Sequence, residues 1–161
     1  MTDYQYYMDS RRDRTIERPG PLWRSSGDNW EYLSLLDWEW HPLAPKRVPQ
    51  SPPVEVLEPI SEQQADELSR DRQRFVSYWA RYSESAWESG GKPFTVLRRR
   101  SSPELVLDEA FGRENTWIKT SSVVEFEHPA FNNTLYLKDV DAETAERILR
   151  DIRGVSGATE L

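Results

Sequence analysis

Two histidines, each followed by proline, are the residues whose chemistry first suggests a catalytic or metal site. His41 and His128 both end the pattern W-x3-S-x6-H-P. A general base needs an imidazole that an acceptor orients and that points at a nucleophile. The carboxylates nearest in sequence are Asp37, Glu39 and Glu127, but no nucleophile elbow or HExxH pair fixes their geometry. A hydrolase that uses His41 or His128 therefore stays an alternative function.

The two copies of the pattern differ in what surrounds them. Aromatic residues dominate the first copy, whereas valines and acidic residues dominate the second, so chance is favoured over duplication as its origin. A residue before proline is restricted to an extended backbone, which is typical of a strand end. The histidine spacing matches no helical ligand pair, and no glycines are arranged to bind nucleotide phosphates. We predict no catalytic residue, no metal and no cofactor.

Aromatic side chains offer a second kind of chemistry, because four of the seven tryptophans lie between Trp23 and Trp40. Tryptophan buries a large apolar area and belongs in a core or at a contact surface. Alternation along this segment predicts that its even-numbered aromatic residues share one side of a strand. Most would then be structural, and Trp23 or Trp40 would be left for a partner. The candidate partner-binding or ligand-binding residues are Trp23, Arg24, Trp30, Tyr32, Trp38, Trp40 and His41.

Composition limits the classes of function. The chain has 161 residues, no cysteine and a net charge of −7, and residues 101–161 carry 6 basic and 12 acidic side chains. An acidic third repels a phosphate backbone and attracts a basic partner. The basic run Arg98–Arg100 is too short to change this, so nucleic-acid binding is not expected. No secretion signal and no apolar stretch of about 20 residues is present, which predicts a cytoplasmic protein without a membrane segment.

Hydrophobic periodicity and turn residues predict the elements that position these side chains. Residues 1–41 read as a β-meander, although a helix starting near Asp28 competes for the tryptophan segment. A proline-rich connector at 42–60 with one edge strand at 54–57 follows. The next segment, 61–88, contains a helix over about 61–86 that a Ser61–Gln64 capping box opens. Further predicted elements are strands at 4–8, 22–24, 30–33, 94–97, 104–107, 117–120, 123–127 and 134–137, and a helix at 141–153 that begins at Asp141 and stops at Gly154.

The resulting fold class is α+β, with a mostly antiparallel sheet and two packed helices in one small domain over residues 1–154. Residues 155–161 are expected to fray. The preferred function is a small, acidic, non-enzymatic protein-interaction module such as an adaptor, an inhibitor or an antitoxin-like or immunity-like binder. Its expected partner is another protein with a basic surface. The alternative is a small-ligand or carbohydrate-binding protein in which tryptophan and tyrosine form stacking walls.

Overall fold

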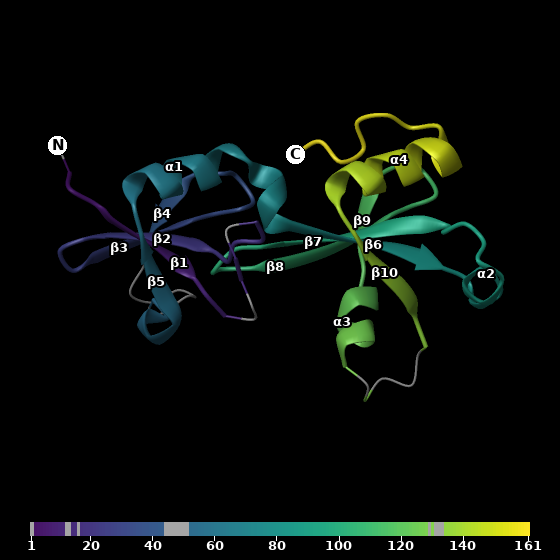
Figure 1. Ribbon diagram of the computed structural model, residues 1–161, viewed down its shortest axis with the longest axis horizontal. Helices are drawn as coiled ribbons and strands as arrows, with labels where there is room; N and C mark the ends of the chain where they lie inside the picture. The colour runs from purple at the N-terminus through teal and green to yellow at the C-terminus, as the bar shows by residue number, and fades with distance from the viewer. Residues whose placement is uncertain (1, 12–13, 16, 44–51, 129, 131–133) are drawn as a thin grey trace. The chain divides into compact units, whose positions relative to one another are not determined.

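A computed structural model of the chain describes residues 2–11, 14–15, 17–43, 52–128, 130 and 134–161 (Figure 1). The described residues form two five-stranded sheets and four α-helices, which confirms the α+β class. They divide into two compact units. Unit 1 comprises Met1–Phe75 and Arg100–Val106, and unit 2 comprises Val76–Arg99 and Leu107–Leu161. That the two units fold as the single domain expected from the sequence stays a prediction.

The sheet of unit 1, sheet A, has the order β4-β3-β2-β1-β5 with antiparallel neighbours. A two-residue loop joins β2 to β3, and its first residue, Gly27, has a φ of 58°, a backbone angle that favours glycine. The strands are β1 (Gln5–Asp9), β2 (Leu22–Ser26), β3 (Asn29–Leu33), β4 (Trp40–Pro42) and β5 (Leu57–Ile60). The predicted meander and its hairpin are thus present.

One face of sheet A is covered by α1 (Glu62–Arg70). The helix begins at the predicted capping box, in which Ser61 and Gln64 exchange hydrogen bonds. Its buried Leu68 packs against a cluster of side chains from sheet A and the segment that follows β3. The other buried members of that cluster are Met8, Leu22, Leu33, Leu35 and Phe75.

The helix predicted over residues 61–86 is wrong in its extent, because α1 stops at Arg70. A 3-10 turn, η2 (Arg72–Phe75), follows, and strand β6 (Val76–Tyr82) comes next. The apolar residues of this stretch fit a helical and an alternating period alike. Its β-branched and aromatic residues favour a pleated strand, in which Tyr78 and Ala80 are buried on one face. A second short helix, α2 (Glu84–Ser89), then ends at Gly90.

Sheet B of unit 2 has the order β10-β6-β7-β8-β9 and helices on both faces (Figure 1). On one face, Ala145 and Leu149 of α4 pack with Tyr78 and Val96. On the other face, Val123 of α3 packs with two leucines. The remaining elements are β7 (Thr95–Ser101), β8 (Val106–Phe111), β9 (Trp117–Lys119), α3 (Ser122–Glu127), β10 (Tyr136–Val140) and α4 (Ala142–Arg153).

Two predicted strands are wrong. The strand expected at 123–127 is helix α3, which Ser121 precedes without a side-chain capping bond. Thr120 Oγ1 accepts a hydrogen bond from the Ser122 N–H, and Ser121 Oγ donates to Glu125 one turn later. The edge strand expected at 54–57 is a 3-10 turn, η1 (Val54–Val56), and β5 starts only at Leu57. The middle of the predicted connector, residues 44–51, lies outside the described residues.

The C-terminal helix agrees with its prediction. Asp141 accepts a hydrogen bond from the Thr144 N–H, and Gly154 ends the helix at a φ of 66°. Residues 155–161, for which fraying was expected, make specific contacts here. Trp117 Nε1 donates to the Ala158 carbonyl over 2.8 Å, and Val155 packs against the core of unit 2.

Gly20 offers a test of how tightly β1 is packed in unit 1. A Cβ at this position would lie 2.0 Å from the Asp9 carbonyl oxygen, so backbone must move to admit it. We expect Gly20→Ala to lower the free energy of unfolding by about 3 kcal/mol in urea denaturation. Gly27→Ala has open space and only backbone strain, so its cost is about 1 kcal/mol. Equal losses in the two variants would contradict the packing of β1.

Candidate functional site

The backbone turn between β3 and β4 decides where the tryptophans lie. Trp38 adopts a φ of 64°, which is uncommon for an aromatic residue. Its N–H donates to the Ser34 carbonyl, and its indole Nε1 donates to the Ser69 carbonyl on α1 over 2.8 Å. Arg72 donates to the carbonyls of Leu35 and Leu36 from outside the turn. The turn is therefore held by side chains distant in sequence.

This turn separates the aromatic residues that the sequence analysis placed on one side. Trp30 and Tyr32 point to one face of sheet A, whereas Trp40 pairs with Leu33 on the opposite face. Trp38 leaves the sheet and packs edge-on against Phe75, with 5.4 Å between ring centroids. The prediction that these four residues act as one set is wrong, since the alternation stops where the chain reverses.

Arg24 is the centre of an aromatic cluster that we call the Arg24 cage, formed by Tyr4, Arg24, Glu31 and Trp40. Its guanidinium carbon lies 3.9 Å from the Tyr4 ring centroid and 4.5 Å from that of Trp40. Its Nε pairs with the carboxylate of Glu31, the residue opposite it on β3. Cation–π contact and a charged hydrogen bond together hold the side chain in place.

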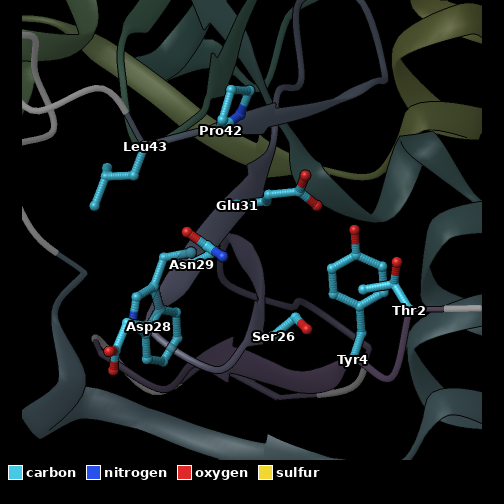
Figure 2. Close-up of a pocket in the computed structure, with 9 residues that line it drawn as sticks. Thr2, Tyr4, Ser26, Asp28, Asn29, Glu31, Pro42 and Leu43 are labelled. Atoms are coloured by element: carbon cyan, nitrogen blue, oxygen red, sulfur yellow. The ribbon is translucent and has the colours of Figure 1, made fainter.

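An open hollow of about 560 Å³ adjoins this cage at the turn of the β2–β3 hairpin (Figure 2). We call it the hairpin hollow. Two carboxylates, an amide and several hydroxyls line it, together with aromatic and apolar side chains. Its lining residues are Thr2, Tyr4, Ser26, Asp28, Asn29, Trp30, Glu31, Pro42 and Leu43.

Three of the predicted binding residues lie on the face of sheet A opposite the Arg24 cage, where they are buried or stacked on one another: Trp23, Tyr32 and His41. Trp23 is only 1% exposed, so the prediction that it is left uncovered for a partner is wrong. Its indole meets the Tyr32 ring edge-on at 5.8 Å, and Tyr32 stacks on His41 at the same distance. Glu104 accepts hydrogen bonds from Tyr32 over 2.6 Å and from Ser34 over 2.7 Å. These contacts give the face a structural role.

The two histidines have different local surroundings. His41 Nε2 lies 2.7 Å from Asp37 Oδ2, but Ser34 of the same sequence pattern donates to Glu104 instead. In the second copy, Ser121 precedes α3 and donates to its own helix, and His128 ends that helix. The two copies therefore differ in local structure. Among the described residues, no three histidine or acidic side chains are grouped to hold a metal ion.

An exposed aromatic cluster in unit 2 was missed by the sequence analysis. All seven tryptophans are described, and Trp87 is the most open of them at 46% exposed. It projects from α2 onto Tyr82 and Tyr136, with ring centroids 5.5 Å and 5.7 Å away. Tyr82 and Tyr136 are register partners on β6 and β10. A separate short helix at Glu84–Ser89 would have indicated this cluster, but the sequence analysis assigned the start of that segment to the long helix predicted over 61–86.

Acidic groups border this cluster, which we call the Trp87 patch: Tyr82, Glu84, Trp87, Glu88 and Tyr136. Glu84 and Glu88 are exposed and stand one helical turn apart on α2. The pKa of Tyr136 is raised, first by burial and then by Glu84 and Glu88. The patch thus combines an open indole with negative charge.

Two residues of the basic run, Arg98 and Arg99, form ion pairs inside unit 2. Arg98 pairs with Glu109 on the neighbouring strand over 3.0 Å, and its guanidinium carbon lies 4.2 Å from the Trp117 ring centroid. Arg99 pairs with Asp108 over 2.7 Å and with Glu127. Both guanidinium groups are therefore neutralised by internal carboxylates. That this run does not bind nucleic acid stays a prediction.

Comparison with known proteins adds no family. No protein-family model matches the chain, and neither the curated proteins nor the solved structures contain a match. Of the helices in the described residues, none combines the length and the apolar character that crossing a membrane requires.

The hydrogen bond from Tyr32 to Glu104 can be tested by titrating the tyrosine hydroxyl. The pKa of Tyr32 is raised from 10.0 to about 12, first by burial and then by its hydrogen bond to Glu104. Because the folded state keeps this proton longer than the unfolded chain, the contribution to stability is complete below pH 10 and is lost as the pH rises through 12. We expect a late step in tyrosinate absorbance that loses the contribution of one tyrosine in Tyr32→Phe, and part of which Glu104→Gln moves toward pH 10. A late step of unchanged size in Tyr32→Phe would contradict the assignment.

Proposed function

We propose that this chain is a small, non-enzymatic protein-interaction module that binds a basic segment of another protein through the Trp87 patch. The observation that carries the proposal is the 46% exposed indole of Trp87, fixed between two tyrosines on the surface of unit 2. Tryptophan and tyrosine contribute disproportionately to binding energy at protein interfaces. An indole that neighbouring rings already hold in place loses little conformational entropy on binding.

The charge around the indole specifies the kind of partner. Glu84 and Glu88 lie on the same helix as Trp87, and both act on Tyr136, whose ring contacts the indole. A lysine or arginine that approaches the indole therefore approaches negative charge. Cation–π attraction and a charged hydrogen bond favour such a group over a neutral or acidic one. The acidic excess of residues 101–161 adds long-range attraction for a basic protein. A cytoplasmic location stays part of this proposal.

Five of the seven residues proposed from the sequence are held by contacts inside unit 1. Trp23, Tyr32 and Trp38 support the core of unit 1, and Arg24 and Trp40 form the Arg24 cage. We therefore transfer the partner-binding role from the tryptophan-rich segment to Trp87. Adaptor, inhibitor and antitoxin-like or immunity-like binders all remain compatible with this role.

The proposal is tested by placing a photo-crosslinking amino acid at position 87 in the native host and identifying the protein that it captures. The captured protein is then purified, and its affinity for the full chain is measured by calorimetry. We expect Trp87→Ala to weaken binding by about thirtyfold, the size of an interface hot spot. Glu84→Gln with Glu88→Gln is expected to slow association and to reduce its dependence on salt.

Ile118→Ala is the matched control, because Ile118 is 54% exposed on β9, at the opposite edge of sheet B from β10. Its affinity is expected to stay within about twofold of the unmodified chain. The proposal is overturned if the purified partner binds the Trp87 variant as tightly as it binds the unmodified chain, or if it loses as much affinity with Ile118→Ala.

A further inference from the structure

The hairpin hollow in unit 1 is a second site whose chemistry is separate from the Trp87 patch. From the structure we infer that it binds an organic monocation, a guanidinium or ammonium group carried by a small molecule or by a protein side chain. The argument rests on the residues that line the hollow, on a guanidinium that the protein itself places at its wall, and on one carboxylate without a counter-charge. It does not depend on the proposed function.

The hollow has the volume of a small-ligand site and a lining rich in polar side chains. Its volume of about 560 Å³ lies within the usual range for such pockets. Figure 2 shows side chains from the N-terminal segment, both arms of the hairpin and the end of β4 around a common opening. The polar groups are mostly oxygen acceptors, including the carboxylates of Asp28 and Glu31 and the hydroxyl of Tyr4. Acceptors of this kind match the N–H groups of a cation.

Arg24 shows that the wall of the hollow already accommodates a planar cation. Its guanidinium carbon lies 3.9 Å from the centroid of the Tyr4 ring, and its Nε pairs with Glu31. Tyr4 and Glu31 both line the hollow, so the internal guanidinium and the proposed ligand share one wall. An aromatic ring and a carboxylate are the partners that stabilise a guanidinium best.

Asp28 leaves the hollow with an uncompensated charge. Glu31 is neutralised by Arg24, whereas Asp28 is exposed in the hairpin loop and has no ion pair or hydrogen bond within the described part of the chain. Among the lining residues and Arg24, the formal charges therefore leave one negative unit. A ligand with a single positive charge restores neutrality, which selects a monocation over a neutral sugar or an anion.

The inference is tested by nuclear magnetic resonance titration of the full chain with two probes, N-acetyl-arginine methylamide and ethylguanidinium. The expected result is saturable shifts of the Asp28 and Asn29 amide signals with both probes. N-acetyl-citrulline methylamide has nearly the same shape as the first probe without its charge, and glucose represents a neutral polyol. Both are expected to bind at least about tenfold more weakly, because they lack a charged hydrogen bond to Asp28.

Asp28→Asn keeps the size of the loop side chain and removes its charge, so it should weaken binding of the arginine probe by about tenfold. Asp66→Asn removes the same charge from an exposed position on α1 and should leave the affinity unchanged. If the arginine probe binds more strongly than ethylguanidinium, the cation that fills the hollow belongs to a protein side chain. If ethylguanidinium binds more strongly, the cation belongs to a small molecule. Equal binding of citrulline or glucose, or an unchanged affinity in Asp28→Asn, would overturn the inference.

Discussion

The reversal of the chain at Trp38 is the constraint on which the arrangement of unit 1 depends. A left-handed backbone at an aromatic residue is unfavourable by itself and persists only where surrounding contacts fix it. Here the indole donates to Ser69 and packs on Phe75, while Arg72 binds two carbonyls of the turn. Because the chain reverses at this point, Trp40 lies on the face of sheet A that α1 covers, where it forms part of the Arg24 cage, and Trp30 lies on the other face.

Elements that local chemistry determines could be predicted from the sequence. The capping box at Ser61 and the helix from Asp141 to Gly154 are correct, since each end is fixed by hydrogen bonds within a few residues. The strand at Val76–Tyr82 was missed because its apolar residues fit both periods and pairing with β10 decides between them. The turn at Trp38 could not be predicted, since the residues that hold it lie more than thirty positions away.

The dependence on distant contacts also explains why the sequence analysis pointed to the tryptophan-rich segment and missed Trp87. Tryptophan density indicated the segment from Trp23 to Trp40, but density does not distinguish a buried ring from an exposed one, and Trp23 is buried. Exposure depends on which neighbours cover a ring, and the ring neighbours of Trp87 among the described residues are Tyr82 on β6 and Tyr136 on β10. Arg24 was proposed as a binding residue because it follows Trp23, whereas its aromatic partners in the structure are Tyr4 and Trp40. These pairings come from strand register, which the sequence does not display.

The central claim is that Trp23 is buried in unit 1 and that Trp87, in unit 2, is the tryptophan most open to a protein partner. It is tested most directly by fluorine resonance of the 5-fluorotryptophan-labelled chain with a soluble paramagnetic agent, each of the seven signals being assigned by a tryptophan-to-phenylalanine variant. The account predicts the strongest relaxation for Trp87 and almost none for Trp23, and protection of Trp87 alone when the partner binds. Stronger relaxation of Trp23 or Trp40 than of Trp87 would contradict it.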